Sequence, residues 1–259
     1  MNRNPKWRNF TIQSIVRRNA VFEIKICGVR LKSDIDAVRA ACDGISSTHD
    51  ASPNADAARR NHSVAVGLNF YPPSVRFIEP ADPSSRSLST AAQDAGLLRV
   101  GVFVNETAAA IQAVNSVVGL DAVQLHGDEL IQTAIELIAS GHSVIRAIKL
   151  PTVDLSVDLI EQRVAPWTEV GCHPLLDADA GAAHGGSGKT LDWSIVSAWA
   201  ASHPDLAWTL AGGLNPDNVA AAITESTAKS IDTASGAEET RGIKSPSKIQ
   251  AFFQAASRL

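Results

Sequence analysis

Cysteine is scarce in this sequence of 259 residues, with three copies at Cys27, Cys42 and Cys172. Their spacing is wide and irregular, and no two of them form a C-x-x-C pair. This pattern excludes a disulfide framework and a cysteine zinc site, and it favours a reducing cytoplasm as the compartment. No second ligand lies at metal-ligand spacing from His126, so we predict no metal ion.

Long hydrophobic runs and an excess of one charge are also lacking. No stretch approaches the roughly 18 uninterrupted apolar residues of a membrane helix, so we expect no membrane partner. Lys and Arg number 23 against 27 Asp and Glu, a net charge of -4. This balance argues against nucleic acid as a partner, because its binders carry a basic stripe. The composition, 45% apolar and 19% charged, is that of a globular protein.

The first twenty residues carry five basic residues and no acidic one. They lack the apolar segment of a secretory signal. An organellar transit peptide is an alternative, but we expect residues 1–20 to form a flexible N-terminal extension.

Short apolar runs rich in β-branched residues recur from residue 21 onward, and helix-like stretches separate most of them. Such an alternation predicts a parallel sheet built from βαβ units. Eight units in about 240 residues fit a closed barrel better than a doubly wound sheet, whose G-x-G-x-x-G motif is missing. We therefore predict a single (β/α)8 TIM barrel over residues 21–259. The expected strands lie within 21–27, 64–70, 98–104, 122–125, 143–150, 173–177, 206–212 and 229–233.

Two tracts interrupt this rhythm. Residues 43–63 are polar and rich in Ala, Asn and Ser, which predicts a surface insertion between the first helix and the second strand. Residues 178–190 form a Gly-rich loop after the sixth strand, on the face where a barrel carries its active site. Within it, AHGGSGKT (183–190) fits a relaxed phosphate-loop pattern, with Ala183 where the strict pattern requires Gly.

Cys27 falls at the predicted carboxyl end of the first strand, where a barrel places catalytic groups. Alternation puts Lys25 and Cys27 on one face, which we expect to point into the barrel, because the intervening isoleucines suit packing against helices. A lysine this close would stabilise the thiolate and lower the thiol pKa below about 8.5. Cys27 would then serve as a base or nucleophile; the alternative is a buried structural cysteine.

Two further polar residues end predicted strands on the same side of the barrel. Asp177 closes the apolar run PLLD, where a carboxylate is costly unless it is hydrogen-bonded, protonated or functional. Partial burial would raise its pKa, as a general acid requires, whereas the alternative is a capping or loop aspartate. His126 shares a face with Gln124, and we favour a hydrogen-bonded core or loop histidine for it.

Small residues after the seventh and eighth predicted strands favour an anion site, because these loops commonly bind phosphate in a barrel. Arg76, after the second strand, could pair with a carboxylate through two hydrogen bonds, or it could be an ordinary surface arginine. Asp232 would turn towards hydroxyl groups of the substrate rather than towards phosphate. These small residues lie in LAGGL (210–214) and DTASG (232–236).

Eight motifs, in order, make residues 23–258 resemble the phosphoribosylanthranilate isomerase family of tryptophan biosynthesis. The resemblance implies a (β/α)8 barrel that works without a cofactor and acts on a small molecule. It implies an Amadori rearrangement of N-(5-phosphoribosyl)anthranilate to 1-(2-carboxyphenylamino)-1-deoxyribulose 5-phosphate. The motifs are KICG (25–28), FYPPSVRFI (70–78), RVGVFVN (99–105), VQLHGDE (123–129), LLD (175–177), GGSGKTLDW (185–193), LAGGLNPDNV (210–219) and IDTASG (231–236).

Carried over by motif, the resemblance assigns Cys27 as the general base and Asp177 as the general acid. Arg76 would hold the anthranilate carboxylate, and Asp232 would orient sugar hydroxyls. The phosphate would rest on the backbone of Gly212, Gly213, Ser235 and Gly236. A loop containing Gly186, Ser187 and Gly188 would close over it, and the remaining site candidates are Lys25, Gln124 and His126.

The chain departs from the family pattern in several places. Val29-Arg30 follow KICG where Ile-Thr is usual, which adds a positive charge near the base. LAGGL replaces LSGGL and DTASG replaces DVSSG, although Ser235 is kept. These changes affect expected affinity and dynamics, and none of them removes a predicted catalytic group.

Alternative functions use the same predicted barrel. One is a lyase or epimerase on another sugar phosphate, for which Lys149 is the residue to test. A nucleotide-binding module acting through Lys189 and Thr190 is another, and a non-catalytic phosphate-binding barrel is a third. A monomer and a homodimer are both compatible with the sequence.

Overall fold

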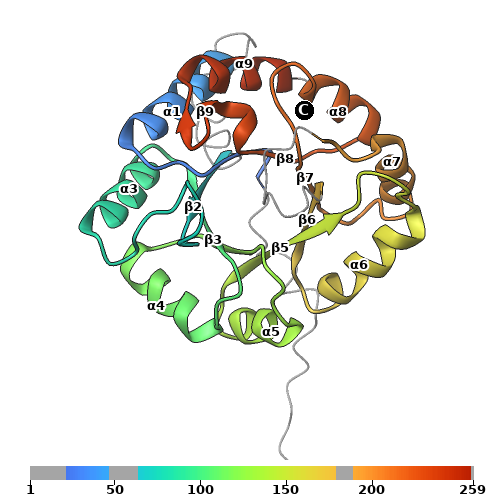
Figure 1. Cartoon of the computed structure of the whole chain (residues 1–259), viewed down its shortest axis with the longest axis horizontal. Coiled ribbons are helices and arrows are strands. Elements are labelled where there is room, and N and C mark those ends of the chain that lie inside the picture. Colours follow the sequence, from blue (N-terminus) through green and yellow to red (C-terminus); the bar gives the residue numbers. More distant parts are fainter. Residues whose placement is uncertain (1–21, 47–63, 179–188, 258–259) are drawn as a thin grey trace, which may run out of the picture.

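A closed barrel of eight parallel strands forms the centre of the molecule. The computed structural model describes residues 22–46, 64–178 and 189–257. Within them each strand pairs with the next in chain order, and β8 returns to pair with β1. Figure 1 looks down the barrel and shows the helices as a ring outside the strands. The predicted (β/α)8 TIM barrel is confirmed.

Each of the eight predicted apolar runs coincides with one barrel strand, and β6 extends one residue beyond its run, to Ala178. The strands are β1 Ile24–Cys27, β2 Val64–Asn69, β3 Leu98–Phe103, β4 Ala122–Leu125, β5 Ser143–Leu150, β6 His173–Ala178, β7 Thr209–Leu210 and β8 Ile231–Thr233. The helices are α1 Lys32–Ser46, α3 Pro83–Asp94, α4 Ala108–Val118, α5 Ile131–Ala139, α6 Val157–Glu169, α7 Trp193–Ala201, α8 Val219–Ser226 and α9 Pro246–Ala256.

Capping residues define where several helices begin. At α9, the Ser245 side chain accepts a hydrogen bond from the backbone N–H of Lys248. Pro246 takes the first helical position, as its sequence context predicts, because the N–H that proline lacks would have no partner there. At α4, Thr107 caps the helix by accepting from Ala110.

The first helix is longer than the sequence predicts. The polar insertion was expected to begin at residue 43, but α1 continues to Ser46. An ion pair between Arg39 and Asp43, one helical turn apart, stabilises this last part of the helix. The boundary at 43 is therefore wrong. The rest of the expected insertion, 47–63, and the N-terminal extension lie outside the described residues.

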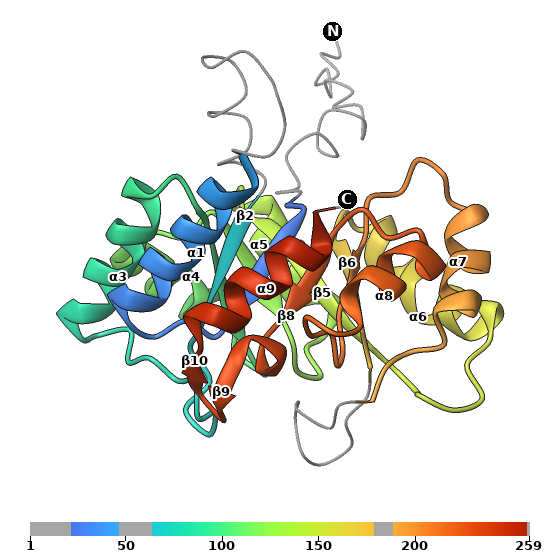
Figure 2. The same ribbon diagram turned by 90° about the horizontal axis from the view of Figure 1, so that it is seen from above.

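A short hairpin after β8 was not predicted. A turn of 3-10 helix, η4 (Ser235–Ala237), leads into the antiparallel strands β9 (Glu238–Thr240) and β10 (Ile243–Lys244). The turn between them contains Gly242, whose φ of 86° favours glycine. Figure 2 shows the hairpin at one end of the barrel. Because it follows β8 directly, it lies at the end where the parallel strands finish.

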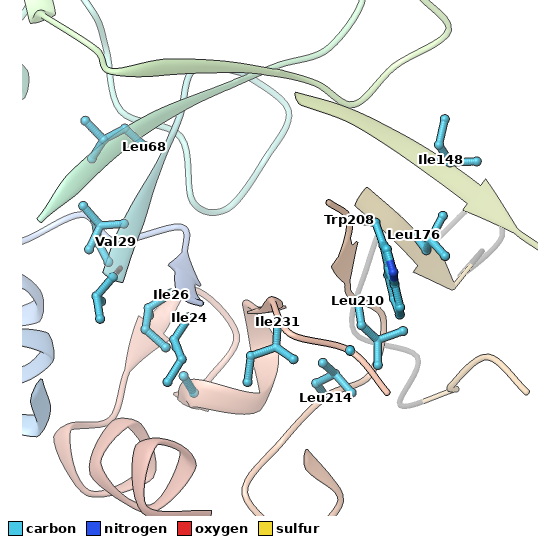
Figure 3. Close-up of a cluster of buried hydrophobic side chains, with 14 of the residues drawn as sticks. Ile24, Ile26, Val29, Leu68, Ile148, Leu176, Trp208, Leu210, Leu214 and Ile231 are labelled. Carbon is cyan, nitrogen blue, oxygen red and sulfur yellow. The ribbon is translucent and has the colours of Figure 1, made fainter. Parts of the chain in front are cut away.

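Apolar side chains pack on both faces of the barrel wall. A large cluster lies between the strands and the helices, and Figure 3 shows Ile24, Ile26 and Ile231 within it. The isoleucines of β1 point outward, so alternation turns Lys25 and Cys27 inward, as the sequence predicts. A smaller cluster consists of Phe22, Ala65, Val100, Ala122, Ile145, Ala147, Leu175 and Ala211. None of the described helices is long and apolar enough to cross a membrane.

Candidate active site

Lys25 and Asp232 form a buried ion pair between the first and last strands. The two residues are register partners across β1 and β8, and Lys25 Nζ lies 2.7 Å from Asp232 Oδ1. The Lys25 side chain is fully buried. Burial lowers the pKa of Lys25, but the charges of Asp232 and Cys27 outweigh this effect and raise it. Lys25 is therefore a cation held inside the barrel by its partner carboxylate.

Cys27 follows Lys25 on the same inward face and is also buried. Burial raises the pKa of its thiol, while the charges of Lys25 and Lys244 act in the opposite direction; the net shift is upward. The expectation of a lowered thiol pKa is therefore wrong. Its physical cause is that the thiol is desolvated and that Asp232 already neutralises much of the field of Lys25.

A glycine on the neighbouring strand makes room for this thiol. Gly67 on β2 is the register partner of Cys27, and a Cβ atom built there would lie 2.7 Å from the sulfur. No side chain fits at that distance without displacing Cys27. Gly67 was not predicted as a site residue, because only the pairing of β1 with β2 reveals the contact.

Asp177 and His126 meet at the carboxyl ends of β6 and β4. His126 Nε2 lies 3.1 Å from Asp177 Oδ2, and both side chains are partly exposed. On its other side, His126 Nδ1 lies 3.2 Å from Nε2 of the buried Gln124. With Gln124 donating at Nδ1, the neutral imidazole carries its proton on Nε2 and donates to the carboxylate. The predicted hydrogen-bonded histidine thus connects Gln124 to Asp177.

Arg76 is buried and paired, so the alternative of an ordinary surface arginine is wrong. Its Nε and Nη2 donate to the two carboxylate oxygens of Glu238 at 2.6 and 2.9 Å. The stem of Arg76 passes over Gly28, where an added Cβ would lie 2.3 Å from Arg76 Cδ. Lys244 Nζ contacts the same Glu238 carboxylate at 3.0 Å. Glu238 and Lys244 were not predicted as site residues, although both follow the DTASG motif closely.

Backbone approaches at the predicted phosphate loops require glycine. Gly212 and Gly213 have φ angles of 86° and 68°, which few other residues adopt. A Cβ at Gly212 would lie 2.4 Å from the Ala178 backbone N, and one at Gly236 would lie 2.0 Å from the Leu214 carbonyl oxygen. Ser235 and Gly236 both lie in the turn of 3-10 helix that leads into the hairpin. The loops after β7 and β8 therefore pack too closely at Gly212 and Gly236 to accept a side chain.

The rest of the Gly-rich loop is only partly described. Gly186, Ser187 and Gly188 lie outside the described residues. Residues 189–192 are not helical, and α7 begins at Trp193 with Asp192 as its cap. A phosphate-binding loop of the nucleotide type needs its helix to begin at the Lys-Thr pair, so Lys189 and Thr190 do not fit that alternative.

Lys149 also faces the mouth of the barrel, as the register partner of Asp177 across β5 and β6. Its Nζ lies 3.9 Å from Asp128 Oδ1, and the Asp128 side chain is 87% exposed. Among the described residues no three His, Cys, Asp or Glu side chains are grouped closely enough to hold a metal ion.

Comparison with known proteins shows which family the chain belongs to. Residues 68–255 match the family model of N-(5'-phosphoribosyl)anthranilate isomerase. The enzyme of that name from Rhodospirillum rubrum is 36% identical over 238 residues, which cover 90% of this chain and 96% of the relative. The chain belongs to this family. Membership in a family of phosphoribosylanthranilate isomerases makes the chain an isomerase of this kind, rather than the lyase, the epimerase or the nucleotide-binding module considered as alternatives.

Solved structures of the phosphoribosylanthranilate isomerase family share the fold. The crystal structure of the Thermotoga maritima enzyme has a TM-score of 0.71 and 31% identity, and the match covers 92% of this chain and all of that one. Another crystal structure of a phosphoribosylanthranilate isomerase, in complex with reduced 1-(o-carboxyphenylamino)-1-deoxyribulose 5-phosphate, has a TM-score of 0.67 and 30% identity, with the same coverage of both chains.

Proposed function

We propose that this chain converts N-(5-phosphoribosyl)anthranilate into 1-(2-carboxyphenylamino)-1-deoxyribulose 5-phosphate in L-tryptophan biosynthesis. The observation that carries the proposal is the placement of Cys27 and Asp177 on inward-facing positions at the ends of β1 and β6. An acid and a base on one mouth are what an aldose-to-ketose rearrangement needs. The Lys25–Asp232 ion pair lies beside the thiol. His126, which is hydrogen-bonded to Gln124, contacts the carboxyl group of Asp177.

Asp177 acts first as the general acid. Its carboxyl proton passes to the ribose ring oxygen, the bond between that oxygen and C1 breaks, and the aniline nitrogen becomes part of a Schiff base. His126, within hydrogen-bonding distance of Asp177 Oδ2, supports the carboxylate that this step produces. With the transferred proton, the former ring oxygen becomes the hydroxyl group on C4 of the opened sugar.

Cys27 then acts as the general base. As a thiolate it removes the proton from C2, and the electron pair moves through C1 to the Schiff-base nitrogen, giving an enolamine. Tautomerisation of the enolamine yields the ketone. Because burial raises the thiol pKa, only a minority of molecules hold the thiolate at neutral pH. That thiolate is a stronger base towards C2, and the charges of Lys25 and Lys244 stabilise it.

The two ends of the substrate are anions, and the site offers each a separate partner. Arg76 binds the anthranilate carboxylate. Asp232 accepts hydrogen bonds from the sugar hydroxyls, and the phosphate contacts the backbone N–H groups of Gly212, Gly213, Ser235 and Gly236. Closely packed glycines let the backbone approach a phosphate without interference from side chains. The working unit is a monomer or a homodimer, which sedimentation would decide.

The decay of phosphoribosylanthranilate fluorescence, with substrate generated in situ from anthranilate, tests this proposal. We expect decay with the wild-type protein and a loss of roughly 100- to 10,000-fold in folded Cys27→Ser and Asp177→Asn variants. Cys42→Ser and Asp94→Asn are matched controls on α1 and α3 and should retain wild-type rates. No decay with folded wild-type protein would refute the function. Loss in only one of the two variants would refute the role of the other residue.

A further inference from the structure

Glu238, at the start of β9, makes four polar contacts through its carboxylate although it is only 4% exposed. Arg76 donates to both oxygens, at 2.6 and 2.9 Å. Lys244 Nζ donates at 3.0 Å, and so does the backbone N–H of Gly242. A buried carboxylate with this many donors has a fixed position. The contact between Arg76 and Glu238 joins residues 162 positions apart in the chain.

The guanidinium of Arg76 has two edges that can hold a carboxylate. Glu238 occupies the edge formed by Nε and Nη2. Nη1 makes no hydrogen bond to any described residue, and Nη2 has a second N–H. The end-on edge therefore keeps one N–H on each of Nη1 and Nη2 without a partner among the described residues, and two parallel hydrogen bonds from this edge would suit a second carboxylate.

The charges around Arg76 leave one positive charge for a ligand. Arg76 and Lys244 are cations and Glu238 is an anion. Burial raises the pKa of Glu238, but the hydrogen bonds and charges of Arg76 and Lys244 lower it further, so the group is ionised at neutral pH. Lys244 also donates to the Ala234 carbonyl oxygen at 2.8 Å, which holds it beside Glu238. With Lys244 in place, a second carboxylate at Arg76 meets a net positive site.

The opposite side of Arg76 is also restrained. Its stem passes over Gly28, the residue directly after Cys27. Arg76 is thus held between the backbone after β1 and the hairpin after β8. Burial lowers the pKa of Arg76, but its hydrogen bonds to Glu238 and the charge of that carboxylate outweigh this effect and raise it.

We propose that Glu238 is a positioning residue for carboxylate recognition: it fixes the plane of the Arg76 guanidinium so that the open edge receives the substrate carboxylate, and Lys244 cancels the repulsion that Glu238 would otherwise exert. The inference rests on the proposed function in one respect, namely that the ligand carries a carboxylate on its aromatic ring. It adds two residues, Glu238 and Lys244, to the recognition of that group.

Calorimetric binding of two ligands to the full chain tests the proposal. One ligand is reduced 1-(o-carboxyphenylamino)-1-deoxyribulose 5-phosphate, and the other is the same compound without its carboxylate. Glu238→Gln keeps the size of the side chain and removes its charge. We expect roughly 10- to 100-fold weaker binding of the carboxylated ligand and less than about twofold change for the other. Glu239→Gln, at the exposed neighbouring position, should change neither.

Equal weakening of both ligands in Glu238→Gln would show a merely structural role and overturn the proposal, as would no weakening of either. If Glu238→Gln does not fold, Glu238→Asp gives the same comparison, because it keeps the negative charge that balances Lys244 while shortening the side chain that holds the Arg76 guanidinium. Turnover by the wild type is measured separately. Its absence refutes the proposed function, whereas selective loss of the carboxylated ligand depends on binding alone.

Discussion

Lys25 and Asp232 face each other across the strand pair that closes the barrel, with 2.7 Å between Nζ and Oδ1. The pair lies beside Cys27, so a contact between the first and last strands also supports the proposed base. Removing one member of a buried ion pair leaves the other charge without compensation inside the protein. The pair therefore has consequences for stability as well as for chemistry.

Asp232→Ala should lower the free energy of unfolding by about 3–5 kcal/mol, because it leaves the fully buried Lys25 cation unpaired. Urea unfolding followed by circular dichroism measures the change. Asp36→Ala removes a partner from the exposed Lys32–Asp36 pair on α1 and should cost less than about 0.5 kcal/mol. Similar losses in the two variants would show that burial of the Lys25–Asp232 pair is not what makes it important.

Gly67→Ala should abolish turnover, because the new methyl group would lie 2.7 Å from the Cys27 sulfur and displace it. Fluorescence decay of the substrate measures activity, and thermal unfolding reports on stability. Gly44→Ala is the control: nothing lies within 4 Å of its added Cβ on α1, and it should be neutral or stabilising by about 0.4–1 kcal/mol. Full activity in Gly67→Ala would contradict the placement of the thiol.

Cys27 should react slowly with iodoacetamide at neutral pH and faster as the pH rises. Burial raises its thiol pKa above the ordinary value of 9.0, so the reactive thiolate forms mainly above that pH. The rate is measured in a Cys42→Ala, Cys172→Ala background, in which Cys27 is the remaining cysteine. Adding Lys25→Met should move the titration to still higher pH, and Lys32→Met should not. An apparent pKa below 9 would contradict the prediction.

His173 should make the protein less stable in acid. Burial lowers the pKa of this histidine from 6.5 to about 4, so between these values the unfolded chain binds a proton that the folded chain does not. The part of the free energy of unfolding that depends on neutral His173 is fully present above pH 6.5. As the pH falls towards 4, the free energy of unfolding decreases by on the order of 3 kcal/mol.

The measurement for His173 is the free energy of unfolding at several pH values between 7 and 4. His173→Gln keeps a polar group near Thr209, to which His173 is hydrogen-bonded, and should flatten the slope in that range. Gln132→Asn, at an exposed and non-titrating position on α5, should leave the slope unchanged. A slope that persists in His173→Gln would assign the acid sensitivity to other groups.

Local patterns were enough to predict the barrel and the inward direction of its polar residues. Alternation along β1 separates Ile24 and Ile26 from Lys25 and Cys27 whatever the rest of the chain does, because successive strand residues point to opposite faces. The end of α1 and the hairpin at Glu238 were not predicted, since polar residues such as Asp43 occur equally in exposed helices and in loops.

Tertiary structure decided what the site residues contact. Glu238 meets Arg76 across 162 positions and Asp232 meets Lys25 across 207, distances at which sequence spacing carries no information about contact. The thiol pKa of Cys27 shows the physical reason. A nearby lysine is visible in the sequence, but desolvation and the carboxylate that pairs with that lysine exist only once the barrel has closed.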